Sequence, residues 1–192
     1  MIIQGNEDLR IQKTIIAIKG IFSNMLLAMD YDKITVKELC DKAKINKKTF
    51  YKYYENLDFL LAELLDEFSN DFLNRIKDYT VPDDLEKINR EFFKYSTEQG
   101  ELYEKIICNA ADRHIGSKMI DKIVKATWNK SSDFNELDKY KKKILLAFIY
   151  NVGIEIYRQW ISDNKKISLE EIIDISNKLL CRGIFGFFDI KS

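Results

Sequence analysis

Hydrophobic positions recur every three or four residues along the whole chain, and nowhere with a convincing period of two. Near the N-terminus this spacing puts one apolar stripe on a helix over about residues 8–29, formed by Ile11, Ile15, Ile18, Phe22, Met25, Leu26 and Met29. The same period predicts further helices over about 35–42, from 47, over some 21 residues from 57, and over 82–98, 101–110, 115–130, 135–162 and 169–188. We therefore expect an all-α fold of about nine helices.

Capping residues stand where several of these helices begin. Thr35 and Glu38 form a capping box, because a threonine hydroxyl accepts from the third helical N–H while the glutamate reaches back. Residues of the same type precede other helices, namely Asn46, Asn56, and the pair Ser168 and Glu171. The only proline, Pro82, fits the first position of the fifth helix, where its missing N–H is no loss.

The second and third helices are separated only by Ala43, Lys44 and Ile45. So short a turn makes the two helices cross steeply instead of lying antiparallel, which is the geometry of a helix-turn-helix. On the third helix, aromatic side chains three and four residues apart form an anchoring face, Phe50, Tyr53 and Tyr54. The opposite face carries Lys47, Lys48, Tyr51 and Lys52, with Thr49 at its edge. Such a helix suits the DNA major groove, which admits one helix.

The charge distribution supports this interpretation. The chain has no net charge, but residues 33–53 hold seven lysines against only Glu38 and Asp41. Residues 57–192 carry 21 basic and 24 acidic side chains. A compact basic patch on a slightly acidic protein is typical of a nucleic-acid contact, although lysine-rich helix faces are also commonly just solvated surface.

The segment from about Leu9 to Leu65 resembles the DNA-binding domain of the tetracycline-repressor (TetR/AcrR) family. The similarity rests on Ile21-Phe22 at the end of the first helix, on T-V-x-E-L-x-x-x-A from Thr35, and on T-F-Y-x-Y-Y from Thr49 before a leucine-rich helix. The resemblance implies a helix-turn-helix over 34–54 within a DNA-binding domain at 1–56, and a regulatory and dimerisation domain at 57–192. Together with the exposed polar pattern it predicts these DNA-binding residues: Thr35, Lys37, Lys44, Asn46, Lys47, Lys48, Thr49, Tyr51 and Lys52.

Two positions depart from the family pattern. Lys44 stands where the turn usually has glycine, and a non-glycine residue with positive φ costs about 1 kcal/mol. Leu57 stands where the family usually has a lysine, so one phosphate contact is absent or comes from Lys52 or Asn56. Both departures concern single contacts and leave the helix-turn-helix assignment in place.

The last two helices are apolar on more than one face, as residues 144–152 illustrate. Such a helix needs cover on more than one side, which predicts a two-fold homodimer through a four-helix contact. The alternative is a deeply buried helix pair within a monomer. The residues expected at the dimer contact are Phe148, Val152, Ile156, Leu179, Ile184 and Phe187.

Residues from Ala147 onward also resemble a C-terminal subtype that includes regulators related to the dihydroxyacetone-kinase activator. The family resemblance implies a small effector, apolar or aromatic, between the helices of this domain. Aromatic residues that are candidates to line its pocket are Phe68, Phe72, Phe92, Phe93, Tyr103, Trp128 and Tyr150. An ordinary helical core contains the same residue types, so this alternative stays open.

No pattern supports catalysis, a cofactor or a metal site. Cys40, Cys108 and Cys181 are too far apart for a metal motif and are expected to be buried thiols, and His114, the only histidine, fits a surface or helix-end position. The longest apolar run has seven residues, well below the roughly 18 that cross a bilayer. We expect a cytoplasmic protein with no membrane partner.

The sequence thus favours a homodimeric transcriptional regulator that binds a palindromic double-stranded DNA operator, most simply as a repressor released by an effector. An activator of the same family and a helical ligand-binding or scaffold protein without specific DNA binding are the alternatives. An all-α enzyme is disfavoured, because the chain lacks nucleophile-elbow and phosphate-binding motifs.

Overall fold

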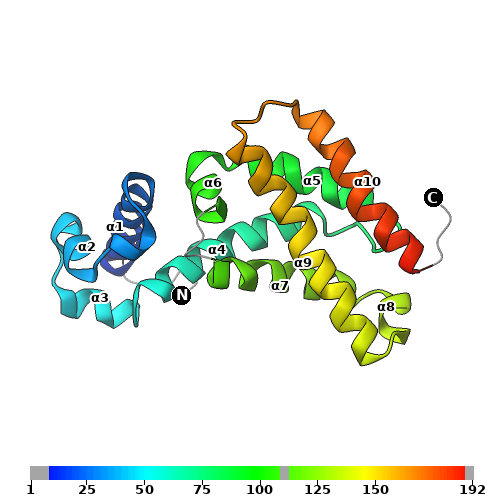
Figure 1. Ribbon diagram of the computed structural model, residues 1–192. Coiled ribbons are helices and arrows are strands. Elements are labelled where there is room, and N and C mark those ends of the chain that lie inside the picture. The colour runs from blue at the N-terminus through cyan, green and yellow to red at the C-terminus, as the bar shows by residue number, and fades with distance from the viewer. Residues whose placement is uncertain (1–8, 109–112, 189–192) are drawn as a thin grey trace.

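The computed structural model describes residues 9–108 and 113–188, with only the backbone described for 113–120 and Tyr150. Over these residues the chain forms ten α-helices, one 3-10 helix and no strand (Figure 1), which confirms the all-α prediction. The α-helices are α1 (Leu9–Ala28), α2 (Val36–Ala43), α3 (Lys47–Tyr53), α4 (Leu57–Arg75), α5 (Leu85–Glu98), α6 (Gly100–Cys108), α7 (Arg113–Trp128), α8 (Ser132–Glu136), α9 (Lys139–Ser162) and α10 (Leu169–Phe187). The 3-10 helix, η1, covers Tyr31–Lys33.

The helices form two connected lobes (Figure 1). Helices α1, α2 and α3 make a small lobe at one end, and α4 runs from it into the larger lobe. There α4 packs on α7, α5 packs on α10, and α9 contacts α6, α7 and α10. The expected domain boundary at residue 57 coincides with the start of α4, yet α6 also packs on α1, so the lobes share contacts beyond the connecting helix.

One hydrophobic core extends through both lobes. It includes Phe22 of α1, Leu39 of α2 and Phe50 of α3, and continues to Phe93 of α5 and Tyr157 of α9. All five side chains are buried. The small lobe is therefore held to the larger one by burial of apolar surface, the dominant favourable contribution to folding.

The caps expected from the sequence are present. The backbone N–H of Glu38 donates to Thr35 Oγ1 (3.2 Å), that of Lys48 to Asn46 Oδ1 (2.8 Å), that of Phe59 to Asn56 Oδ1 (3.0 Å) and that of Glu171 to Ser168 Oγ (3.2 Å). These side chains satisfy N–H groups that have no partner within their helix. The beginnings of α2, α3, α4 and α10 were thus predictable from local residue chemistry.

Two expected helix starts were wrong. Pro82 lies in a turn after a cis Val81–Pro82 bond, and α5 begins only at Leu85, where Asp84 accepts from the Thr80 N–H (3.0 Å) and holds the turn. The expected helix over 135–162 is divided into α8 and α9. Asp138 causes the division, because its carboxylate accepts from the N–H groups of Tyr140 (2.8 Å) and Lys141 (3.1 Å) and caps a new helix.

Helix α1 is, among the described residues, the one helix long and apolar enough to cross a membrane. Its Ile18, Phe22 and Met25 are buried in the shared core, and Lys19 forms ion pairs with α4. These contacts give α1 the packing of a core helix, so its length and composition are weak evidence for a membrane span.

Candidate nucleic-acid interface and ligand cavity

Lys44 makes the tight turn between α2 and α3 by adopting left-handed backbone angles, φ 53° and ψ 42°. The turn is closed by hydrogen bonds from Lys44 N–H to Asp41 O (3.3 Å) and from Ile45 N–H to Cys40 O (3.0 Å). Lysine thus occupies the conformation that glycine adopts without steric cost. The prediction that a non-glycine residue adopts a positive φ at this turn is therefore confirmed.

Buried aromatic residues hold α3 in place. Phe50 has no exposed surface, and Tyr54, the residue that ends the helix, is 3% exposed. Their ring centroids lie 5.7 Å apart, and Tyr51 meets Phe50 edge to face at 5.5 Å. A helix of seven residues has little stability alone, so this anchoring fixes which face it shows to solvent.

The lysines of α3 are exposed. The helix lies along an edge of the small lobe and leads into α4 (Figure 1). Tyr51 is 56% exposed. The other predicted DNA-binding residues that are exposed are Thr35, Lys37, Lys44, Asn46, Lys47, Lys48 and Lys52. Thr49 is half-buried. The structure therefore leaves eight of the nine predicted residues exposed. The side chains of Thr35 and Asn46 are also engaged as helix caps.

Ionic contacts join this small lobe to α4. Lys19 Nζ of α1 lies 3.3 Å from Glu63 Oε1 and 2.5 Å from Glu67 Oε1, both on α4. Tyr31 donates to Asp58 at the start of the same helix. Burial, followed by the neighbouring Glu63 carboxylate, raises the pKa of the Tyr54 hydroxyl, which therefore stays protonated. The start of α4 is thus fixed against α1 and close to the end of α3.

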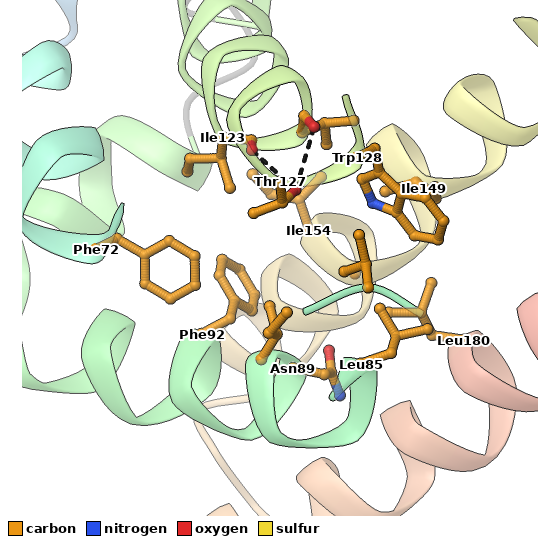
Figure 2. Close-up of a pocket in the computed structure, with 14 residues that line it drawn as sticks. Phe72, Leu85, Asn89, Phe92, Ile123, Thr127, Trp128, Ile149, Ile154 and Leu180 are labelled. Atoms are coloured by element: carbon orange, nitrogen blue, oxygen red, sulfur yellow. Dashed lines mark hydrogen bonds between the residues drawn. The ribbon is translucent and has the colours of Figure 1, made fainter. Parts of the chain in front are cut away.

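The larger lobe contains an apolar cavity of about 110 Å³ (Figure 2). Helices α4, α5, α7, α9 and α10 and the turn before α5 contribute its lining, namely Phe72, Val81, Leu85, Ile88, Asn89, Phe92, Ile123, Val124, Thr127, Trp128, Ile149, Gly153, Ile154 and Leu180. Figure 2 shows the rings of Phe72 and Phe92 side by side at one end and Trp128 at the other. The cavity thus lies where the helices of this lobe converge.

Three of the aromatic residues considered for a ligand pocket, Phe72, Phe92 and Trp128, line this cavity. Phe68 instead packs edge to face on Tyr103 (5.1 Å), and Phe93 and Tyr103 are buried in the shared core, where burial raises the pKa of Tyr103 to about 12. The side chain of Tyr150 lies outside the described residues.

Sequence reasoning missed most of the lining because it considered only aromatic residues. The aliphatic lining residues follow the ordinary core spacing of α5, α7 and α9, so nothing in the sequence separates them from packing residues. Asn89 gave a usable signal, since an amide on the apolar face of a helix needs buried partners. Its Nδ2 donates to Ser176 Oγ (3.1 Å) and to Asn177 Oδ1 (2.7 Å) of α10.

Large apolar side chains are exposed along α9 and α10, and we call this set of residues the tail face. Its exposed members are Tyr140, Ile144, Phe148, Ile175, Leu179 and Phe187. Of the residues expected at a dimer contact, Phe148, Leu179 and Phe187 belong to it, and Val152 and Ile156 are half-buried. Ile184 has no exposed surface and belongs to the same buried cluster as Leu180 and Leu145 within the chain, so the expectation that it reaches a partner was wrong.

The described residues contain no group of three or more histidine, cysteine or acidic side chains that suits a metal ion. Cys40 and Cys181 are buried as expected, and burial raises the pKa of Cys181 to about 12. Cys108 is exposed at the end of α6, contrary to the expectation. The His114 side chain lies outside the described part of the chain.

Similarity to known proteins agrees with this architecture. Residues 83–181 match the family model TetR_C_8, described as a transcriptional regulator C-terminal region. The HTH-type dhaKLM operon transcriptional activator DhaS of Lactococcus lactis subsp. lactis (strain IL1403) is 36% identical over 73 residues, which cover 36% of this chain and 37% of DhaS. That match spans well under two thirds of the relative's length.

Two solved structures share the fold. A TetR transcriptional regulator from Streptococcus agalactiae 2603V superposes with a TM-score of 0.65 at 22% identity, covering 89% of this chain and 95% of that one. The regulator FadR from Bacillus subtilis, in complex with stearoyl-CoA, gives a TM-score of 0.62 at 16% identity, covering 88% and 98%. Because the family model covers more than half of the chain and the fold agrees, this protein belongs to the TetR family of transcriptional regulators.

Proposed function

We propose that the protein binds a palindromic operator as a homodimer and represses transcription until an effector occupies the cavity. The observation that carries the proposal is the outer face of α3, where Lys47, Lys48 and Lys52 are exposed on a helix anchored by the buried Phe50. Lysines neutralise DNA phosphates, and the exposed Tyr51 supplies a hydroxyl for phosphate or base edges. Such a function places the protein in the cytoplasm.

The tail face supports the homodimer. Leu179 is 58% exposed and Ile144 67% exposed, although both lie on helices that otherwise form the core. An apolar face of this kind is best covered by a second copy of itself in a two-fold contact. Two α3 helices related by that axis would enter successive major grooves about 34–36 Å apart, or somewhat more on a longer operator.

The cavity and α3 are connected through α4. Phe72 lines the cavity near the end of α4, while Glu63 and Glu67, nearer its start, hold Lys19 of α1. A ligand changes the DNA-binding equilibrium only by its different affinity for the two states of the protein. In this proposal an effector in the cavity favours a position of α4 in which the distance between the two α3 helices of the dimer no longer matches successive major grooves.

The test is a mobility-shift assay on the DNA upstream of the protein's own gene, repeated at increasing salt. Wild type is compared with Lys47→Ala/Lys48→Ala and with a control pair, Lys77→Ala/Lys130→Ala, which removes two exposed lysines of the larger lobe. Specific binding with a steep salt dependence is expected for wild type and the control pair, and loss of binding for the α3 pair. Retained binding by the α3 pair would reject this contact face.

Activation is the second candidate, favoured by the similarity to DhaS, a transcriptional activator. In-vitro transcription from the bound promoter separates the two signs of regulation. Lower transcript yield on adding protein supports repression, and higher yield supports activation. Failure to bind any double-stranded fragment, together with retained ligand binding, would favour a helical ligand-binding protein without specific DNA binding.

A further inference from the structure

We propose that the effector of this cavity is a small, uncharged, apolar molecule that lies against the bare backbone of Gly153. The inference rests on the proposed function, because it assigns a chemical class to the ligand of that regulatory cavity. Three features of the lining carry it: the absence of charge, the hydrogen bonding of its polar side chains, and the space beside Gly153.

None of the lining residues carries a charge, and the polar groups on their side chains are those of Asn89 and Thr127 and the indole N–H of Trp128. Moving an ionised group from water into such surroundings is costly without a paired opposite charge. An anionic or cationic ligand would find no counter-charge in this lining. The effector is therefore neutral in the part that enters the cavity.

Both polar side chains already use their donors within the protein. The two N–H groups of Asn89 bind Ser176 and Asn177, and the Thr127 hydroxyl donates back to its own helix, to Ile123 O (3.0 Å) and Val124 O (3.1 Å), as Figure 2 shows for Thr127. The indole N–H of Trp128 is the remaining side-chain donor among these lining residues. An occupant therefore needs at most one acceptor atom, and its affinity comes from apolar burial.

Gly153 provides the open space. It lies in the middle of α9, one helical turn after Ile149, so both residues face the cavity. A Cβ atom built on Gly153 meets no heavy atom within 4 Å. Any larger residue at this position would extend a side chain into that space, so the missing side chain helps to create the volume that a ligand fills.

The volume sets the size of the occupant. An apolar cavity of about 150 Å³ stays dry and binds benzene in another protein. The cavity here, at about 110 Å³, is of that order and below the range of roughly 300 Å³ upward that holds drug-sized ligands. We therefore assign to the cavity a ligand about the size of a single six-membered ring. Such a ligand is smaller than the stearoyl-CoA bound by the structural neighbour FadR, and unlike it is uncharged.

The experiment uses the full-length protein and the matched probes toluene and benzoate, which share a ring and differ in charge. Binding is followed by thermal shift of the wild type and by Trp128 fluorescence in a Trp160→Phe background, since Trp160 lies in the shared core away from the cavity. We expect saturable binding of toluene and at least about tenfold weaker binding of benzoate, because the cavity offers its carboxylate no partner. Stearoyl-CoA serves as the large, anionic comparison and is expected not to bind in the cavity.

Gly153→Leu fills the cavity, and Gly20→Leu adds the same side chain on the exposed side of α1. We expect Gly153→Leu to lower toluene affinity at least about tenfold and Gly20→Leu to leave it unchanged. Circular dichroism checks that each variant is folded. If Gly153→Leu does not fold, Leu180→Phe, which narrows the cavity from α10, takes its place.

Two readouts separate the inference from the function on which it rests. Binding of the upstream DNA is measured without a probe, and toluene binding is measured without DNA. Operator binding with no toluene binding, or with benzoate or stearoyl-CoA binding as tightly as toluene, overturns the ligand class and leaves the DNA function intact. Toluene binding without any DNA binding supports the ligand class and rejects the operator function. Toluene binding that changes the operator affinity supports both.

Discussion

Asn89 of α5 and Ser176 of α10 exchange two hydrogen bonds in the interior of the larger lobe. Asn89 Nδ2 donates to Ser176 Oγ (3.1 Å), and the Ser176 hydroxyl donates to Asn89 Oδ1 (3.2 Å). Asn89 is 4% exposed and Ser176 is wholly buried. The pair connects α5, through the cavity-lining Asn89, to α10, which carries half of the tail face. It also gives hydrogen-bond partners to polar groups that water does not reach.

Replacing Asn89 by leucine should destabilise the protein by about 1–3 kcal/mol, because the buried Ser176 hydroxyl loses its partner and Asn177 Oδ1 loses its amide donor. Urea unfolding at one fixed protein concentration measures the change. Ser132→Ala, at an exposed position of α8, is the control and should change the free energy of unfolding little. Adding Ser176→Ala to Asn89→Leu should cost less than Ser176→Ala alone, since the double variant leaves fewer orphaned groups. Strictly additive losses would contradict this coupling.

Leu179→Glu should convert a homodimer to monomers at micromolar concentration. Leu179 is 58% exposed in the single chain, so a charge there is tolerated by the monomer but would lie without a partner in a two-fold apolar contact. Sedimentation measures the mass, and circular dichroism should show unchanged helicity. Ile16→Glu, at a 62% exposed position of α1, is the matched control and should leave the mass unchanged. An unchanged mass for Leu179→Glu would move the dimer contact away from the tail face.

Local signals in the sequence were sufficient for the helix-turn-helix. The caps at Thr35 and Asn46, the short turn and the aromatic spacing around Phe50 all act within a few residues, so each is visible without knowledge of the fold. The errors at helix boundaries arose where the propensity of a single residue was outweighed by hydrogen bonds of its neighbours. Pro82 suits a helix start by propensity, but the hydrogen bonds of Asp84 to Thr80 place the start at Leu85.

The cavity and the tail face depend on contacts between distant segments and were only partly predictable. Hydrophobic spacing places both Leu179 and Ile184 on one apolar helix. It does not indicate that Leu179 is exposed and that Ile184 is buried in the cluster that also contains Leu145 of α9. Likewise, nothing in the sequence distinguishes Phe92, which lines the cavity, from its neighbour Phe93, which fills the core. Such distinctions arise only when helices far apart in sequence pack together.

Lys44→Gly should have opposite effects on stability and DNA binding. Glycine adopts the left-handed angles of this turn without steric cost, so stability should rise by about 1 kcal/mol in urea unfolding. Loss of the charge should weaken DNA binding and reduce the slope of log affinity against log salt by about 1, if Lys44 contacts a phosphate. Lys44→Ala removes the same charge but keeps the backbone strain. It should therefore match Lys44→Gly in DNA binding and not in stability, and an equal gain in stability would show that the strain is not the cause.

The cap of α9 should make stability depend on pH in the acid range. Backbone N–H groups of Lys141 and Tyr140 donate to the Asp138 carboxylate and lower its pKa below the ordinary value of 3.8. A group with a lowered folded-state pKa contributes stability that is fully present above the unfolded-state pKa and is lost as the pH falls through the folded-state value.

Asp138→Asn keeps an oxygen acceptor but has no charge to lose. The stability difference between wild type and Asp138→Asn should therefore be constant from about pH 6 to about pH 5 and shrink below about pH 4, as measured by urea unfolding. Asp133→Asn, which removes an exposed carboxylate of α8 that is not the N-cap of that helix, is the matched control for the loss of one surface charge. A difference that grows on acidification would mean that the Asp138 carboxylate is not stabilised by these N–H groups in the folded protein.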